Sequence, residues 1–184
     1  VAALPQRRPS VQVELRTGYR LPGPIMDLAA RLLPVAAPGL EPPISIREHG
    51  AEPIVEQVPA SPGEGQDGFA DLLVAAVRRE LEAVEQGSVA VVCPLCAIEE
   101  AEAALDAAGV SYGRATRHGL DQQVTVVEVA MTKGLELDAV IVVEPADILE
   151  GDDRGAQALY VALTRATRRL SMVHERPLPA VLVD

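Results

Sequence analysis

Runs of consecutive aliphatic residues alternate along this chain with segments whose apolar residues recur at helical spacing. Three runs predict buried strands, at residues 89–93 (VAVVC), 124–129 (VTVVEV) and 139–144 (AVIVVE). Helical spacing predicts helices at residues 69–86, ended by Gly87, and from Pro94 to Ala108, ended by Gly109. This alternation predicts an α/β domain with a mainly parallel sheet, whose strands are covered on both faces. Ligands of such sheets bind beyond the carboxyl ends of the strands.

Shorter patterns complete the predicted order of elements. Further strands are expected at residues 11–15, 44–48, 54–58 and 170–174, and a further helix at residues 25–33. Segments rich in Gly, Pro and polar residues predict a turn at 16–24, loops at 34–43 and 60–68, a polar loop or sheet edge at 113–119, and a tight connection at 130–138.

The last predicted helix, residues 155–169, has two contrasting faces. In its sequence ALYVALTRATRRL (158–170), apolar residues fill one arc of a helical projection at about 100° per residue. The opposite arc holds Arg165, Arg168 and Arg169 together with Val161. A basic face of this kind in an acidic chain calls for a specific explanation.

The composition refines this picture. Hydrophobic residues make up 48% of the 184 residues and aromatic residues only 2%, so the core of a single domain is expected to be aliphatic. The formal net charge of −11 argues against a broad nucleic-acid-binding surface, although it permits a few local phosphate contacts. No apolar run is as long as a membrane span, and the chain begins at Val1 without a signal peptide. We therefore expect a cytoplasmic domain without a membrane partner, cut from a longer chain, with residues 1–10 and 175–184 as flexible or linker ends.

Cys93 and Cys96 form a C-x-x-C pattern at the end of a predicted strand and the start of a helix. A thioredoxin-like redox pair lies at such a place, and its sign would be a reactive Cys93 with a low pKa. However, Cys93 continues a buried Val-rich strand, and Pro94 follows it directly. A zinc site needs four ligands, and the sequence has no second C-x-x-C. We expect structural cysteines and no metal site, with redox and metal roles as the alternatives.

The stretch of residues 17–20 (TGYR) offers an aromatic face and a cation in a predicted loop. Tyr19 could stack on a nucleobase while Arg20 contacts a phosphate. The alternative is a tyrosine that packs on the edge of the sheet beside a solvated arginine.

Two later stretches have a similar potential. In residues 132–138 (TKGLELD), Gly134 allows a ligand to approach the backbone and Glu136 could accept sugar hydroxyls. The alternative is a β-turn with a surface Lys/Glu pair. Arg165, within residues 159–166 (LYVALTRA), could reach an anion across a cleft as an arginine finger does, or could simply be solvated.

Together, these three stretches resemble motifs IV, V and VI of superfamily 1 helicases of the UvrD/Rep type, and the resemblance extends from Val11 to Val173. The segments YRLPGPIMDLAARLL, EPPISIREHGAEP and GLELDAVIVVEP look closest to the HelD branch, helicase-like ATPases that act on RNA polymerase. The resemblance implies that residues 1–184 form one domain, 2A. This domain is a RecA-like three-layer α/β sandwich with a mainly parallel sheet, the second domain of a P-loop NTPase.

The resemblance also implies roles for individual residues. Tyr19 would stack on adenine, and Arg20 and Arg165, as the catalytic arginines, would reach the γ-phosphate from across the cleft. Glu136 would hold the ribose, and Gly134 would allow its close approach. Arg165 would thus be the working arginine of the basic face, with Arg168 and Arg169 as solvated or interdomain charges.

Thr132 and Lys133 would couple the nucleotide to a nucleic-acid strand. The chain departs from the family at Gly18, where members usually have Asn, and at Ala130, where many have His. The second departure removes a residue that lies near the single strand. Between Arg20 and Thr132 there is no room for the large inserted domain of UvrD-type members.

The phosphate-binding pattern G-x-x-x-x-G-K-[ST] does not occur in the sequence. The chain is therefore expected to bind no cofactor tightly by itself, and to work with ATP and Mg²⁺ only in a full-length protein that also supplies domain 1A. The further partner would be single-stranded DNA, as in a helicase, or RNA polymerase. The alternative is a freestanding RecA-like module that binds other proteins and hydrolyses no ATP.

Overall fold

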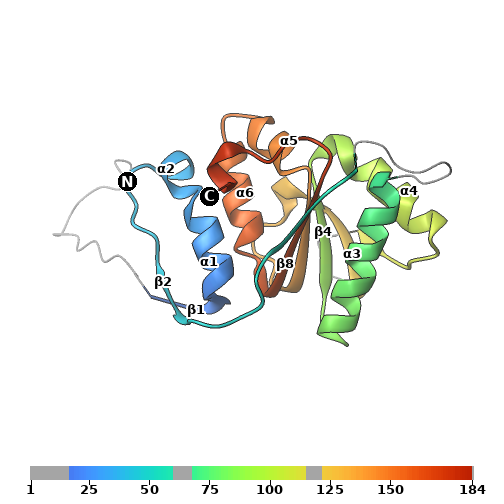
Figure 1. Ribbon diagram of the computed structural model, residues 1–184, viewed down its shortest axis with the longest axis horizontal. Helices are drawn as coiled ribbons and strands as arrows, with labels where there is room; N and C mark the ends of the chain where they lie inside the picture. Colours follow the sequence, from blue (N-terminus) through green and yellow to red (C-terminus); the bar gives the residue numbers. More distant parts are fainter. Residues whose placement is uncertain (1–16, 60–67, 115–121, 184) are drawn as a thin grey trace, which may run out of the picture.

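The computed structural model describes residues 17–59, 68–114 and 122–183. Its centre is a six-stranded sheet in which every pairing is parallel (Figure 1). The strands lie in the order β3 (Ile54–Gln57), β8 (Ala166–His174), β7 (Leu137–Val143), β4 (Val89–Cys93), β6 (Val124–Glu128) and β5 (Gly113–Arg114). The predicted α/β fold with a parallel sheet is therefore confirmed.

Helices cover both faces of this sheet, so the domain has three layers (Figure 1). One face is covered by α1 (Gly23–Ala30) and α6 (Gly155–Leu163), and the other by α3 (Gly68–Val84) and α4 (Ile98–Ala107). The shorter helical elements are α2 (Leu33–Ala36), α5 (Pro145–Glu150) and the 3-10 turns η1 (Leu95–Ala97), η2 (Val129–Met131) and η3 (Ala180–Leu182).

Alternate residues of the central strand β4 face the two helical layers. Val89, Val91 and Cys93 join the core formed with α3 and α4, whereas Ala90 and Val92 join the core formed with α1 and α6. Because both faces are covered, all five residues are buried. A continuous aliphatic run is therefore the correct signal for such a strand.

Residues 17–22 form a strand, β1 (Thr17–Pro22), where the sequence predicts a turn. β1 pairs in parallel with β2 (Ile44–Arg47), and the two make a small separate sheet (Figure 1). Ser45 fastens the pair, because its Oγ donates a hydrogen bond to the carbonyl of Leu21 (2.5 Å). The pairing is irregular between Gly18 and Pro22. This irregularity accommodates the turn-forming residues on which the predicted turn was based.

The helix predicted for residues 155–169 is shorter in the structure, since α6 ends at Leu163. Thr164 closes its last turn by donating from Oγ1 to the carbonyls of Tyr160 (2.9 Å) and Val161 (3.1 Å). These bonds satisfy carbonyls that a helix leaves without a partner where it ends.

The chain then enters β8 at Ala166, which pairs with Leu137 of β7. Arg168 and Arg169 therefore lie on a strand, where successive side chains point to opposite faces. The predicted basic face of a helix is thus wrong. Strand β8 begins four residues before the predicted start at Leu170.

Two smaller differences concern the ends of helices. The sequence analysis missed α5, which begins at Pro145 after Glu144, a residue in the left-handed region (φ 47°). Helix α3 ends at Val84, and Glu85 after it lies in that region (φ 56°), so the helix stops two residues before its predicted end at residue 86. Gly109, with φ 67°, follows α4 as predicted.

Some predicted segments lie outside the described residues: the strand at 11–15, the terminal segment 1–10, the loop at 60–67 and residues 115–119. At the other end, η3 carries Leu182, whose side chain is buried and whose carbonyl accepts a hydrogen bond from Arg31 (2.9 Å). In the described part of the chain, no helix is both long and apolar enough to cross a membrane.

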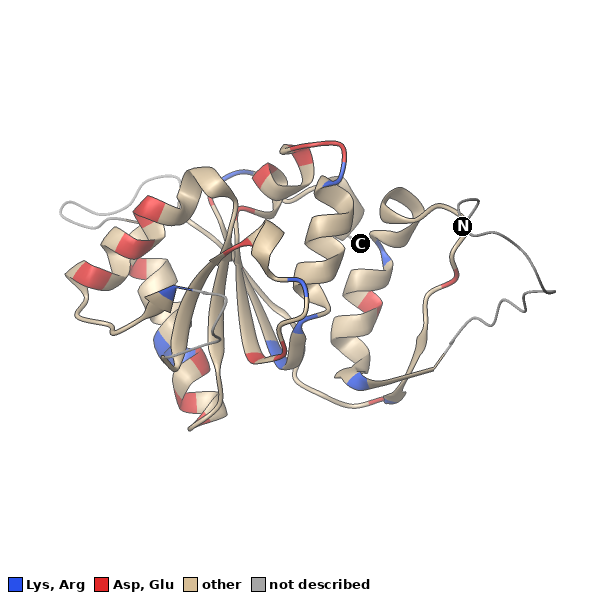
Figure 2. Ribbon diagram, turned by 180° about the vertical axis from the view of Figure 1, so that it is seen from behind, with Lys and Arg blue, Asp and Glu red and all other residues tan. Residues whose placement is uncertain are grey.

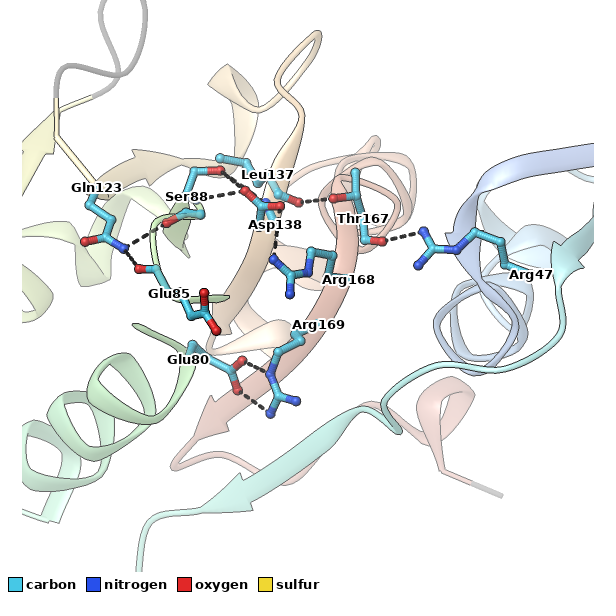
Figure 3. A network of polar contacts seen from close by, with 11 residues as sticks. Arg47, Glu80, Glu85, Ser88, Gln123, Leu137, Asp138, Thr167, Arg168 and Arg169 are labelled. Atoms are coloured by element: carbon cyan, nitrogen blue, oxygen red, sulfur yellow. Dashed lines mark hydrogen bonds and ion pairs between the residues drawn. The ribbon is translucent and has the colours of Figure 1, made fainter. Parts of the chain in front are cut away.

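A buried ionic cluster joins α3 to the sheet. Glu80 is fully buried, and its carboxylate accepts hydrogen bonds from Arg169 Nε (2.5 Å; Figure 3) and Ser171 Oγ (2.7 Å). Beside it, Arg79 pairs with Glu56 of β3 (2.7 Å), a contact that raises the pKa of the Arg79 guanidinium. A buried carboxylate is tolerated only when it is paired, and Arg169 is the nearer of the two cations that compensate Glu80, the other being Arg79 at 3.5 Å.

We expect Arg169→Met to lower the free energy of unfolding by about 3 kcal/mol, because it removes the closest cation from a buried carboxylate and leaves only the longer ion pair with Arg79. Arg168→Met is the matched control, since Arg168 is half exposed and lies 3.9 Å from Asp138. Its loss should stay below about 1 kcal/mol. Urea denaturation of the two variants measures both values, and equal losses would contradict the assigned role of Arg169.

Candidate functional site

The structure brings together residues from all three stretches that the sequence analysis singled out. Arg20 on β1 forms an ion pair with Glu136, which immediately precedes β7, at 2.8 Å between Nη1 and Oε1. Both side chains are substantially exposed, at 43% and 59%. The first two stretches therefore meet at the surface, in a place that solvent and ligands can reach.

Arg165 joins this cluster from the turn between α6 and β8. Its Nη1 donates to the carbonyl of Leu135 (3.2 Å), next to Glu136, and its Nε donates to the carbonyl of Val161 (3.3 Å). The backbone carbonyl of Arg165 in turn accepts from the amide of Leu137 (3.2 Å). The half-buried guanidinium is thus held in place by backbone groups, and it is not a freely solvated charge of a helix surface.

The connection between β6 and β7 is folded by its own backbone. Thr132 is fully buried, and its Oγ1 donates to the carbonyl of Val129 (2.8 Å). Its carbonyl accepts from the amide of Leu135 (3.1 Å), which closes a turn over Lys133 and Gly134. Gly134 has φ +88°, a conformation that favours glycine, and both residues of the turn are exposed.

Tyr19 lies on the small sheet with 70% of its surface exposed, so it does not pack on the edge of the main sheet. The neighbouring strand β2 exposes Ile44 (74%) and Ile46 (63%). Tyr19 and the two isoleucines are thus exposed on the paired strands that carry Arg20, and the tyrosine ring is accessible to a planar group.

The candidate residues gather at the amino ends of the strands, whereas ligands of parallel sheets commonly bind beyond the carboxyl ends. Glu136 and Arg165 immediately precede β7 and β8, so they lie at the amino ends of these strands. The topology is the reason: β6 and β7 both pair in parallel with β4, and residues 129–136 return from the carboxyl end of β6 to the amino end of β7. This return places Thr132 between the two edges.

Two further residues of this region, Arg47 and Thr167, were not predicted from the sequence. Arg47 of β2 donates from Nη1 to the carbonyls of Arg20 (2.7 Å) and Thr167 (2.8 Å), and Thr167 Oγ1 donates to the carbonyl of Leu137 (3.0 Å; Figure 3). All three acceptors are backbone carbonyls. Because every residue carries such a group, no side-chain pattern in the sequence could have indicated these contacts.

A groove of about 330 Å³ at the carboxyl ends of β4 and β6 lies apart from this cluster. Its lining combines exposed Leu95 and Met131 with Glu128 and with Glu102, which pairs with Arg114. Acidic residues also recur along the adjoining helix α4 (Figure 2). None of the predicted site residues lines the groove, so we place the site at the Arg20–Glu136–Arg165 cluster, where the charged groups converge.

The C-x-x-C pattern shows no sign of redox chemistry. The Cys93 side chain is completely buried, and burial, helped by the nearby carboxylate of Glu102, raises the pKa of its thiol to about 12. Both cysteines are free thiols, with Cys96 exposed. A reactive first cysteine needs the opposite pKa shift, so the structural role is favoured.

Comparisons with known proteins show which family and which fold the chain resembles. Residues 123–173 match the family model of the UvrD-like helicase C-terminal domain, and this segment contains Thr132, Glu136 and Arg165. Over this span the match bears out the resemblance to UvrD-type helicases. No curated protein matches the sequence.

Among solved structures, the C-terminal domain of a possible DNA helicase from Lactobacillus plantarum WCFS1 is similar to this chain. It has a TM-score of 0.67 and 24% identity, over 90% of this chain and 92% of that one. This likeness shows a shared RecA-like α/β fold. The helicase nonstructural protein 10 of an arterivirus, solved in complex with DNA, has a TM-score of 0.46 and 15% identity over 85% of this chain and 33% of its own. The Hef helicase domain of Pyrococcus furiosus has a TM-score of 0.42 and 16% identity over 58% and 24%.

The burial of Cys93 leads to a direct test. Brief alkylation of the folded protein with iodoacetamide at about pH 8 should label Cys96 and spare Cys93, because only the exposed thiol is accessible and only a thiolate reacts. Mass spectrometry of peptides locates the label, and denatured protein, in which both cysteines should react, is the control. Preferential labelling of Cys93 would contradict its structural role and revive the redox hypothesis.

Proposed function

We propose that this chain is the second motor domain, 2A, of a helicase-like ATPase, and that it completes a nucleotide site shared with another domain, 1A, of the same protein. The observation that carries the proposal is the meeting of Arg20, Glu136 and Arg165 in one cluster. The match of residues 123–173 to the UvrD-like helicase C-terminal domain supports the same assignment.

The chemistry of the cluster fits a nucleoside triphosphate. The guanidiniums of Arg20 and Arg165 provide positive charge and directed N–H donors for phosphate oxygens. Exposed Tyr19 provides a face for adenine, and the carboxylate of Glu136 can accept hydrogen bonds from ribose hydroxyls. Bound ATP with Mg²⁺ would supply the reacting phosphoryl group, and these residues would orient it and stabilise its charge.

Hydrogen bonds to the backbone already fix the side chain of Arg165 in place for this task. Two of its three guanidinium nitrogens donate to the carbonyls of Val161 and Leu135. The third, Nη2, has no hydrogen-bond partner among the described residues and remains available to an anion. A side chain that is already fixed loses little conformational freedom when it contacts a phosphate, which favours stabilisation of a transition state.

Arg20 and Glu136 must exchange partners when a nucleotide is bound. In the structure each neutralises the other, and an exposed pair of this kind contributes about 1 kcal/mol or less. Its opening therefore costs little. Arg20 then turns to the γ-phosphate and Glu136 to the ribose.

The connection at residues 132–134 is proposed to link the nucleotide to a nucleic-acid strand. Exposed Lys133 is the group that can contact a strand phosphate, while buried Thr132 holds the turn that carries it. Gly134 keeps the backbone close to the nucleotide that Glu136 binds. A shift at either end of this short segment moves the other end.

The HelD-like branch is our preferred assignment within the superfamily, and RNA polymerase is the partner that it implies. In the helicase alternative the partner is single-stranded DNA, which residues 132–134 would contact. The net charge of −11 and the acidic groove at β4 and β6 support contact with a protein more than with a polyanion. The same features also favour the second candidate, a RecA-like module that binds proteins and hydrolyses no ATP. An ATP hydrolysis assay separates the two.

In the full-length protein, we expect Arg165→Ala to lower the turnover number for ATP by about 10³-fold, because a trans-cleft arginine stabilises charge chiefly in the transition state. Steady-state hydrolysis is measured alone, with single-stranded DNA and with RNA polymerase. Stimulation by DNA would indicate a helicase, and stimulation by the polymerase a remodelling ATPase.

Arg168→Ala is the control, since Arg168 is exposed on β8 and should leave turnover within about twofold. Arg165→Lys, which retains a cation, covers the case in which the alanine variant fails to fold, and circular dichroism monitors folding. Unchanged turnover in a folded Arg165 variant would overturn the catalytic role. A wild-type protein without any ATP hydrolysis would favour the interaction module.

A further inference from the structure

A single side chain joins the small sheet to the main sheet beside the candidate site. Arg47 is the last residue of β2, and one of its nitrogens, Nη1, donates to two backbone carbonyls, of which Figure 3 shows that of Thr167. One belongs to Arg20, at 2.7 Å, and the other to Thr167 of β8, at 2.8 Å. Residue 47 is 27 positions from the first acceptor and 120 from the second, so the contact bridges distant parts of the chain.

Thr167 extends the bridge to the next strand. Its Oγ1 donates to the carbonyl of Leu137 (3.0 Å), the residue that follows Glu136. The amide of Leu137 donates to the carbonyl of Arg165. The bonded backbone groups thus lie at, or within two residues of, each of the three charged residues of the cluster.

The bridge is important because it helps to hold β1, the strand that carries Arg20, against the main sheet. β1 carries Tyr19 and Arg20 but pairs only with β2 in the described part of the chain, so no ladder of sheet hydrogen bonds fixes it to β8. Packing of Leu21 in the core beneath α1 holds one end of β1. Beside Arg20 itself, it is the guanidinium of Arg47 that ties β1 to β8.

The geometry points to Arg47 as a positioning residue for the proposed reaction, an inference that rests on the proposed function. With Thr167, it sets the spacing between Arg20 on the small sheet and Arg165 on the main one. Two arginines that contact one phosphate group must be placed to within a fraction of an ångström. We assign Arg47 a positioning role and no contact with the phosphate, because its Nη1 is engaged by backbone carbonyls of both sheets.

A double-mutant cycle on ATP hydrolysis by the full-length protein tests this role. Arg47→Met keeps the apolar stem and removes the donors, and we expect it to lower the turnover number about tenfold. In an Arg20→Ala background, the same substitution should change turnover by less than about twofold, because no Arg20 side chain remains to be positioned. Arg47→Lys, which retains one donor nitrogen on a slightly shorter stem, should recover part of the activity.

Arg78→Met is the matched control. Arg78 is an exposed arginine whose Nη2 also donates to a backbone carbonyl, that of Ala108 (3.3 Å), but it lies between α3 and the end of α4. It should leave turnover unchanged. If Arg47→Met lowered turnover equally with and without the Arg20 side chain, Arg47 would be a general stabiliser and the inference would fail.

A second measurement does not depend on ATP hydrolysis. In the 184-residue chain, Arg47→Met should speed amide hydrogen exchange at least tenfold in β1, and leave exchange in β4 unchanged. Unaltered exchange in β1 would overturn the inference by itself. If exchange in β1 rises but Arg20→Ala has no effect on turnover, the bridge stands and the proposed function is what fails.

Discussion

The hydrogen bond from the amide of Leu137 to the carbonyl of Arg165 marks where β7 and β8 begin to pair, and the candidate site depends on this pairing. It requires α6 to end by Leu163, so that the chain can turn and enter β8 beside β7. It also fixes Glu136 and Arg165 next to each other, although 28 residues of sequence separate them. The local preference of Arg165 for a helix is overridden by a sheet contact.

This early end of α6 gives the three arginines of the segment different tasks. Arg165, in the turn, is held by two carbonyls, and its third guanidinium nitrogen has no hydrogen-bond partner among the residues that the structure describes. Arg168, on the strand, is exposed and only weakly paired with Asp138. Arg169 points to the other face and neutralises buried Glu80. A single basic cluster in the sequence therefore combines an arginine anchored in a turn, a solvated charge and a structural charge, because a turn and a strand separate residues that a helix would have aligned.

Much of the fold could be predicted from hydrophobic periodicity. β4, β6 and β7 are buried on both faces, so their aliphatic runs are unambiguous, and α3 shows clear helical spacing. The prediction failed where local and long-range preferences disagree. The segment 155–169 has a good helical pattern, yet strand pairing converts its second half, and residues 17–22 contain turn-forming residues but find a partner in β2.

The site was predictable only as separate pieces. The residue types of Tyr19, Arg20, Glu136 and Arg165 indicated nucleotide chemistry, and the resemblance to motifs IV, V and VI joined them. The contacts that hold these residues in place could not be predicted. The bridge through Arg47 uses backbone carbonyls, which every residue has, so no sequence pattern indicates it. The edge of the sheet at which these residues gather could not be predicted either, because it depends on β6 and β7 flanking β4.

The pairing of Arg20 with Glu136 has a consequence for selectivity. An unpaired arginine beside a second fixed guanidinium would attract any polyanion, including inorganic polyphosphate and nucleic acid. Neutralisation by Glu136 makes the positive charge conditional, because it is released only when the carboxylate finds another partner. Neighbouring hydroxyl groups of a sugar are such a partner, and a bare phosphate chain has none. In the proposed site, discrimination in favour of nucleosides over simple anions is thus built into one carboxylate, before any contact with the base.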